Sequence, residues 1–166
     1  DGVAAINKET FVNCPALSYI TIPASVEYID SGAFDHCSTL NNVSIDENNP
    51  MYYSVDKVIY HKGDNAIVRY LMSNNNMAFI IPSESTVIGR AAFSGNSHLT
   101  TITIPKSVKW IYEYALHSSK ISIINYEGTI NDWMSVVLKS NISFNVMSFG
   151  GKKYTGEITF TGEYFN

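Results

Sequence analysis

The stretch of sequence that decides the fold is residues 22–45, IPASVEYIDSGAFDHCSTLNNVSI. Its apolar residues fall at offsets 3, 6, 10, 11, 14, 17, 20 and 22 from Pro23; they are Val26, Ile29, Ala33, Phe34, Cys37, Leu40, Val43 and Ile45. The end of the stretch alternates apolar and polar residues, which is typical of a short strand with one buried face. Proline lacks an amide donor, so Pro23 is expected to end a preceding strand of the same kind.

The same spacing recurs along the chain. Counting from Pro82 gives Ile88, Ala92, Phe93, Leu99, Ile102 and Ile104, and counting from Pro105 gives Val108, Ile111, Ala115 and Leu116. Counting backward from Pro23 gives Val3, Ile6, Phe11, Cys14, Leu17, Ile20 and Ile22. We therefore predict four copies of a 23-residue repeat, residues 1–22, 23–45, 82–104 and 105–126. One such unit cannot bury its own apolar face, so the repeats must stack and their strands must form a parallel sheet.

This register resembles the BspA-like class of leucine-rich repeats. The matching residues are Ile22-Pro23-x-Ser25-Val26-x-x-Ile29-x-x-x-Ala33-Phe34-x-x-Cys37-x-x-Leu40, with further matches at Ile88-Gly89-x-x-Ala92-Phe93 and Ile104-Pro105-x-Ser107-Val108-x-x-Ile111. The resemblance covers roughly residues 3–140, although Asp30 and Tyr112 replace a usual glycine and Leu116 replaces phenylalanine. It implies a β-rich right-handed solenoid with a parallel β-sheet.

An insertion interrupts the repeat. Pro82 lies 59 residues after Pro23, which is one period plus 36, so residues 46–81 are predicted to lie between coils. Within them, Val58–His61 and Ala66–Leu71 flank the turn residues 62–65 and predict an inserted β-hairpin.

The repeat stops after Tyr126, and residues 127–166 are predicted to cap the open end of the core. A short capping helix is expected over Asn131–Leu138, with Asn131 as its N-cap, and Gly156–Asn166 is expected to pair as a terminal strand or hairpin. The family resembled here has a similar Tyr-x-Gly-Thr-x-x-x-Trp ending, matched by Tyr126, Gly128, Thr129 and Trp133. Residues 1–166 are therefore expected to form a single leucine-rich-repeat domain.

Composition limits the function. Of 166 residues, 45% are hydrophobic and 16% are charged, and the formal net charge is −4. Basic residues form no stripe, so nucleic-acid binding is not expected. No apolar run approaches the length of a membrane span, so no membrane insertion is expected either. The repeat is already running at Val3, which suggests a piece of a longer protein whose leader would lie outside it.

The residues that carry chemistry form no recognisable active site. The histidines occupy unrelated positions of the repeat, so we expect no metal site; they are His36, His61, His98 and His117. No nucleophile has a base at a known spacing. We therefore predict no catalytic residues, no cofactor and no enzymatic activity.

The two cysteines share one offset in adjacent repeats. This places the Cα atoms of Cys14 and Cys37 about 5 Å apart, which is within reach of a disulfide. Free thiols are the favoured interpretation, because Asn96 and Ser119 occupy the same offset, where small polar side chains can hydrogen-bond the turn backbone.

Two surfaces are candidate binding sites. Alternation places uncharged residues on the outward face of the sheet; they are Tyr19, Thr21, Asn42, Ser44, Thr101 and Thr103, with Ile123 and Asn125 continuing the row. The alternative interpretation of this row is plain solubility on strands that favour threonine and tyrosine. A secondary candidate lies in the insertion and comprises Tyr52, Tyr53, Tyr60, Arg69 and Tyr70, which alternatively fill the core of the hairpin.

The resemblance implies a non-enzymatic protein-binding or adhesion module of a secreted or cell-surface bacterial protein. The expected partner is a host protein or a protein of a neighbouring cell, bound through the outward face of the sheet. Two alternatives stay open. One is a carbohydrate- or wall-binding module, which would need an aromatic platform from Tyr53, Tyr60 or Tyr70, and the other is a structural spacer without its own ligand.

Overall fold

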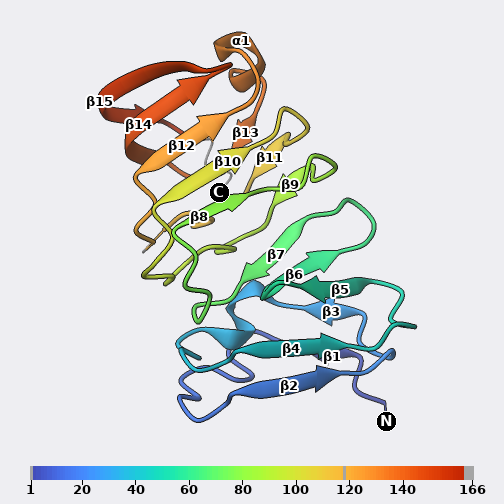
Figure 1. Cartoon of the computed structure of the whole chain (residues 1–166). Coiled ribbons are helices and arrows are strands. Elements are labelled where there is room, and N and C mark those ends of the chain that lie inside the picture. Colours follow the sequence, from blue (N-terminus) through green and yellow to red (C-terminus); the bar gives the residue numbers. More distant parts are fainter. Residues whose placement is uncertain (1, 118, 163–166) are drawn as a thin grey trace.

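The chain folds into a solenoid, seen here in a computed structural model that describes residues 2–117 and 119–162. Each coil contributes one short strand to each of two opposite sheets, and the coils stack along the long axis of the molecule (Figure 1). The predicted solenoid with parallel sheets is therefore confirmed.

The strands that end the repeats form the front sheet, which is divided into two pieces. The first piece pairs β2 (Tyr19–Ile22) with β4 (Asn42–Ile45), and Tyr19 lies opposite Asn42, one repeat further along the chain. The second piece has five strands in the order β15-β14-β12-β10-β8. Their bounds are β8 (Ala78–Ile80), β10 (Thr101–Ile104), β12 (Ile123–Tyr126), β14 (Ile142–Phe149) and β15 (Lys152–Phe160).

The strands in the middle of the repeats form the back sheet. In its first piece β1 (Ala5–Ile6) pairs with β3 (Tyr28–Ile29), just before the 3-10 turn η1 (Ser31–Phe34). Its second piece runs in the order β13-β11-β9-β7-β6-β5. The bounds are β5 (Tyr52–Val55), β6 (Val58–His61), β7 (Ile67–Tyr70), β9 (Val87–Ile88), β11 (Trp110–Ile111) and β13 (Val137–Leu138).

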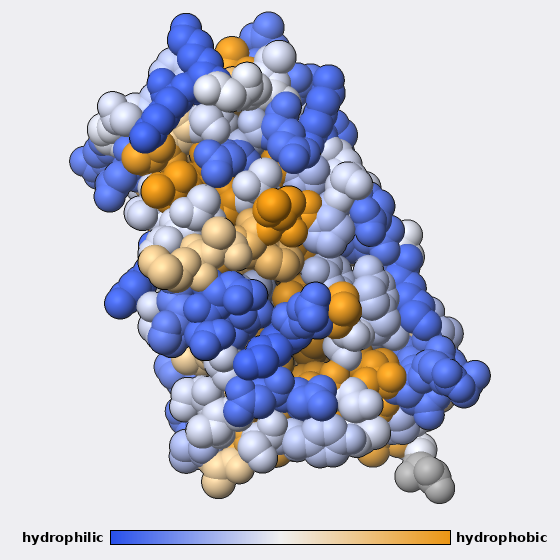
Figure 2. Space-filling view, in the orientation of Figure 1, coloured by the Kyte–Doolittle hydropathy of each residue, from blue (hydrophilic) through white to orange (hydrophobic). Residues whose placement is uncertain are grey.

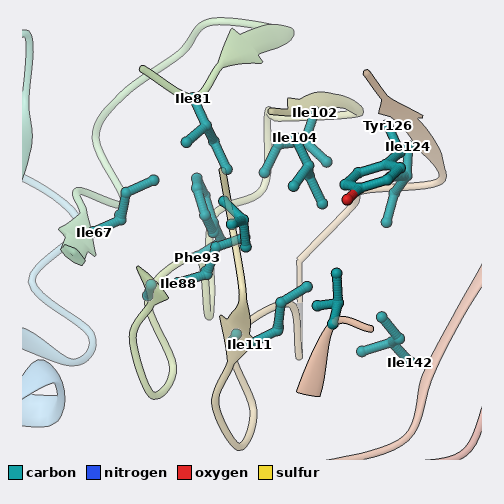
Figure 3. Packing of buried hydrophobic residues seen from close by; sticks show 14 of the residues in the cluster. Ile67, Ile81, Ile88, Phe93, Ile102, Ile104, Ile111, Ile124, Tyr126 and Ile142 are labelled. Carbon is teal, nitrogen blue, oxygen red and sulfur yellow. The ribbon is translucent and has the colours of Figure 1, made fainter. Parts of the chain in front are cut away.

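The apolar offsets of the repeat point into the space between the two sheets. Figure 3 shows buried side chains of both sheets packed together, with Phe93 between Ile81 on the front side and Ile88 on the back side and with Ile124 beside the Tyr126 ring. Aromatic rings pack together where the repeat has its phenylalanine: Phe11 and Phe34 stack with ring centroids 5.6 Å apart, and Tyr70 and Phe93 are tilted by 35° with ring centroids 5.2 Å apart. Coil upon coil therefore covers the apolar edge of its neighbour.

The predicted insertion, residues 46–81, needs a correction, because its second half forms a coil. Phe79 lies opposite Ile102 in the front sheet, and Ile67 lies opposite Ile88 in the back sheet. Only about residues 46–58 are therefore extra chain. The predicted hairpin is present as β6 and β7, and a second hairpin joins β5 to β6. Its turn residues, Asp56 and Lys57, have φ of 50° and 64°, as a tight type I′ turn requires.

The capping helix also differs from the prediction. Helix α1 (Ile130–Trp133) is a single turn, and its N-cap is Thr129 instead of Asn131. The Thr129 hydroxyl accepts a hydrogen bond from the Asp132 amide, and the Asp132 carboxylate accepts one from the Thr129 amide. This reciprocal capping box sets the start of the helix. The residues predicted to end it, Val137–Leu138, instead form the last strand of the back sheet.

The end of the chain closes the core with aromatic residues. Strands β14 and β15 form an antiparallel hairpin, so the terminal strand begins at Lys152, earlier than the predicted Gly156. The end of the predicted segment, residues 163–166, lies outside the described residues. The Trp133 ring packs against three rings, with centroid distances of 5.1 Å to Tyr126, 6.2 Å to Phe149 and 5.5 Å to Phe160. These contacts shield the last coil from water, as a solenoid end requires.

Polar side chains at one offset hydrogen-bond the turns of the solenoid. Cys14 and Cys37 are free thiols, as favoured from the sequence, and the Cys37 thiol donates to the Phe11 carbonyl at 2.9 Å. Asn96 is fully buried and donates to the carbonyls of Leu71 at 3.2 Å and Asn74 at 2.9 Å. These bonds tie each turn to the turn of the preceding coil.

Candidate functional site

The outward side of the first front-sheet piece brings four of the predicted residues together. Tyr19 and Thr21 project from β2 beside Asn42 and Ser44 of β4, in direct register. The Thr21 hydroxyl donates to the Tyr19 hydroxyl at 2.6 Å, which confirms that both side chains lie on one face. Tyr19 is 53% exposed. This group is small, because the piece has only two strands.

The other two predicted residues lie on the five-stranded piece. Thr101 and Thr103 of β10 are half-buried, with β8 on one side and β12 on the other. The pairing of neighbouring strands extends each threonine into an outward row across the sheet. The first row is Ala78, Thr101, Ile123 and Val146, and the second row is Ile80, Thr103, Asn125 and Ser148. We name these eight residues the front face.

The two pieces of the front sheet are separated by the β5–β6 hairpin. The Ser54 hydroxyl donates to the Val43 carbonyl of β4, and the Lys57 ammonium donates to the Asn41 side-chain oxygen at 3.3 Å. The turn of the hairpin thus lies along β4, where the next strand of the sheet would otherwise pair. The predicted row of six residues is therefore split into a group of four and a group of two.

The front face contains residues that the sequence analysis missed. Ala78 and Ile80 were assigned to the insertion, and Val146 and Ser148 to the cap. Ile80 is 70% exposed and the neighbouring Met77 is 69% exposed. Figure 2 shows the result as a band of tan and orange surface over β8 and the strands beside it. Ile81-Pro82 was the available signal, since it repeats the strand endings Ile22-Pro23 and Ile104-Pro105.

A shallow depression of about 450 Å³ lies at one end of the front face. Its lining includes Ile123, Asn125, Val146 and Ser148, and Lys153 of β15 stands at its border. The depression combines apolar walls with a hydroxyl and an amide, and the Ser148 hydroxyl donates to the Asn125 side-chain oxygen at 3.0 Å. Glu127 also lines the depression, so its uncharged centre has charged side chains at the border, as the polar rim of a protein interface does.

The secondary candidate is mostly inside the molecule. Tyr60, Arg69 and Tyr70 are 3%, 1% and 0% exposed, and Tyr52 is also buried. Tyr53 is half-buried and stacks on Tyr60 with ring centroids 5.0 Å apart. Burial raises the pKa of Tyr70 to about 12 and raises the pKa of Tyr60 as well. The burial of Tyr52, Tyr60, Arg69 and Tyr70 matches the alternative in which these residues fill the core, and Tyr53 is the member of the group that is partly exposed.

Arg69 has a structural position at the join between the two halves of the solenoid. Its guanidinium contacts the Asp35 carboxylate at 3.0 Å and donates to the carbonyls of Ala91 at 3.0 Å and Ser31 at 3.3 Å. Burial lowers the pKa of Arg69, and the nearby Asp35 carboxylate opposes that shift. The side chain therefore links coils on both sides of its own and is not available at the surface.

The residues that could carry chemistry are dispersed in the part of the chain that the structure describes. In this part of the chain, no three or more His, Cys, Asp or Glu side chains are grouped in a way that could hold a metal ion. Burial raises the pKa of the Cys37 thiol, which disfavours the nucleophilic thiolate. Within residues 2–117 and 119–162, no helix has the length and hydrophobicity needed to cross a membrane.

Solved structures with the same fold come from bacteria. A leucine-rich repeat protein from Eubacterium ventriosum ATCC 27560 is 24% identical, with a TM-score of 0.64 over 74% of this chain and 32% of that chain. The pneumococcal vaccine antigen PcpA is 22% identical, with a TM-score of 0.56 over 67% of this chain and 30% of that chain. A leucine rich cell surface protein from Faecalibacterium prausnitzii A2-165 is 20% identical, with a TM-score of 0.50 over 73% of this chain and 51% of that chain.

The chain thus spans between about a third and a half of the length of these structures. No curated protein matches the sequence significantly. A family model described as the BspA type leucine-rich repeat region matches residues 1–57 and 65–163 in six copies, two more than the four predicted. The chain therefore belongs to the BspA-type leucine-rich repeat family.

Proposed function

We propose that this chain is a non-enzymatic protein-binding module of a secreted or cell-surface bacterial protein, and that it binds through the front face. The observation that carries the proposal is the five-stranded sheet with its uncharged outward rows and its exposed Ile80. Charged residues are depleted at the centres of protein interfaces, and a rigid sheet loses little conformational freedom on binding.

The surface location is supported by the fold neighbours. The Faecalibacterium prausnitzii protein is named a cell surface protein, and PcpA is named a vaccine antigen. A partner on a host cell or on a neighbouring cell would meet a protein displayed in this way. Solenoids bind along extended faces of this kind because each repeat adds a further pair of outward positions.

Two lysine substitutions on the same kind of strand test the proposal. Thr103→Lys places a charge in the front face, whereas Thr21→Lys places it at the corresponding position of the separate two-stranded piece. Both threonines lie on the outward side, so both variants should fold. The chain is measured against purified extracellular-matrix proteins by surface plasmon resonance. Thr103→Lys should weaken binding at least about tenfold, equivalent to 1.4 kcal/mol, and Thr21→Lys should change it by less than about twofold.

Equal losses in the two variants would contradict the assignment to the front face. The absence of binding to every matrix protein would instead favour the structural spacer. Of the three tyrosines expected to offer a carbohydrate platform, Tyr60 and Tyr70 are buried and Tyr53 is half-buried, so the insertion gives the carbohydrate alternative less support.

A further inference from the structure

An aromatic row lies on the back sheet, on the side of the solenoid away from the front face. Trp110, Tyr112 and Tyr114 alternate along β11 and the turn that follows it, and the side chains are 40%, 38% and 51% exposed. The ring centroids of Trp110 and Tyr112 are 6.4 Å apart and their planes differ by 28°. Ile111 and Ala115, between and beyond them, point into the core.

Cations from the two neighbouring coils stand over this row. The Lys139 ammonium lies 5.2 Å from the centre of the Trp110 ring, and the Arg90 guanidinium carbon lies 5.5 Å from the centre of the Tyr114 ring. Lys139 follows β13 and Arg90 follows β9, the two strands that flank β11 in the sheet (Figure 1). The fold therefore holds a positive charge at each end of the aromatic row.

The local charge contrasts with that of the whole chain. Arg90 and Lys139 stand at the row, and Glu113 lies between Tyr112 and Tyr114 in the sequence and lines the adjoining pocket, whereas the formal net charge of the chain is −4. An acidic ligand would be attracted here although the protein as a whole is acidic.

The backbone of Tyr114 adopts an unfavourable conformation. Its φ is 58°, in the left-handed region, where a bulky side chain is unfavourable. Ala91, one repeat earlier, has φ of 52° at the same place in the turn, and Glu9 of the first repeat has φ of 66°, whereas Gly32 of the second repeat lies in the 3-10 turn η1. The positive φ therefore recurs in three coils. Glycine would satisfy it without strain. The half-exposed Tyr114 ring packs edge-on against the His117 ring, with centroids 5.7 Å apart, and lies beneath the Arg90 guanidinium, so these contacts hold it in place at the surface.

A pocket of about 310 Å³ opens next to Tyr114. Leu116, His117 and Ile142 line it, and its walls are mostly apolar. A ligand that stacks on the row can thus place an apolar group in the pocket. The aromatic row, the two cations and the pocket lie on the coil of β11 and its two neighbouring coils.

We propose that this surface, formed by Trp110, Tyr112, Tyr114, Arg90 and Lys139, binds an acidic polysaccharide. Sugar rings present C–H faces that pack on aromatic rings, while their carboxylate or sulfate groups pair with ammonium and guanidinium groups. A protein partner would need a larger and more continuous apolar patch. The site is independent of the front face, so a surface protein of this design can hold a glycan and a protein at once.

The test uses hyaluronan and heparin as acidic glycans, dextran as a neutral glycan and polyglutamate as an acidic peptide. Binding of the full chain is measured by biolayer interferometry. The chain should bind at least one acidic glycan, bind it at least about tenfold more tightly than dextran or polyglutamate, and lose affinity as salt rises.

Three variants assign that binding to the site. Tyr112→Ser and Tyr114→Gly should each weaken it at least about fivefold, and Tyr114→Gly should remain fully folded because glycine suits its backbone. Tyr19→Ser removes an equally exposed tyrosine from the front sheet and should leave glycan binding unchanged. The proposal is overturned if no acidic glycan binds, if polyglutamate binds as well as the glycans, or if Tyr19→Ser weakens binding as much as the two site variants.

Discussion

Replacing Arg69 tests the way in which the two halves of the solenoid are joined. Its side chain is 1% exposed, and its guanidinium bonds to the two neighbouring coils, that of Asp35 and that of Ala91. Separate apolar clusters lie on either side, one around Phe34 and one around Phe93. Arg69→Met keeps most of the aliphatic stem and removes the polar links, so it isolates their contribution.

The structure allows the cost to be worked out. Removing one partner of a buried ion pair costs about 3–5 kcal/mol. Asp35 is 37% exposed at its side chain and can be rehydrated, so Arg69→Met should lie near the lower end, at about 3 kcal/mol. Arg69→Ala also loses two buried methylenes at about 0.8 kcal/mol each, which brings the cost to about 4–5 kcal/mol. Arg90→Met, at an exposed cation–π contact, should cost about 0.5–1 kcal/mol.

Urea unfolding followed by circular dichroism measures these free energies, and hydrogen exchange locates the loss. In Arg69→Met, amides in residues 2–45 should exchange faster relative to those in residues 82–126, because the first cluster is no longer tied to the second. If Arg69→Met costs no more than Arg90→Met, the polar links do not join the two halves and the reasoning fails.

Two further predictions concern the polar bonds of the turns and the cap. Asn96→Ala should lower the free energy of unfolding, measured in urea, by about 3–5 kcal/mol, because it leaves several buried groups without hydrogen-bond partners. Ser119→Ala removes one half-buried hydrogen bond and should lower it by about 1 kcal/mol or less. Equal losses would contradict the role of Asn96 in tying the turns together. The Thr129 hydroxyl, the Thr129 amide and Lys106 lower the pKa of Asp132 to about 2, so its stabilising effect should be complete above pH of about 4 and disappear as pH falls towards 2. The stability difference between the natural chain and Asp132→Asn should therefore vanish near pH 2, and a difference that does not change with pH would contradict the capping box.

The repeat could be predicted from the sequence because its register is imposed by packing alone. Offsets 11, 20 and 22 must face the core in every coil, so Phe34, Val43 and Ile45 have to be apolar together. The polar offset 14 was predictable for a related reason. A buried turn backbone needs partners, and only a small polar side chain such as Asn96 fits there.

The coil of residues 59–81 was not predicted, because polar residues occupy several of its apolar repeat offsets where it forms the β6–β7 hairpin. Offsets 3, 6, 10 and 17 from Ile59 are Lys62, Asn65, Arg69 and Asn76, none of them apolar. Lys62 and Asn65 lie in the turn of the β6–β7 hairpin, and Arg69 bonds to the coils on both sides of its own. Only Tyr70, Phe79 and Ile81 keep the register, which is too few positions to indicate a repeat without the strand pairing.

That irregular coil determines which surface can bind as a unit. Neighbouring strands of a sheet lie about 4.8 Å apart, so β8 brings Ile80 directly beside Thr103. Tyr19 and Asn42 belong to a sheet that ends at the hairpin turn, where Asp56 and Lys57 present charges between the two pieces. A ligand that held all six predicted residues would have to span this charged turn, whereas one that rests on the front face meets eight uncharged side chains and reaches charges at the border, at Lys153 of β15 and at Glu127. The contrast between Thr103→Lys and Thr21→Lys follows from this division, and a continuous binding row along the whole solenoid would predict equal losses from both.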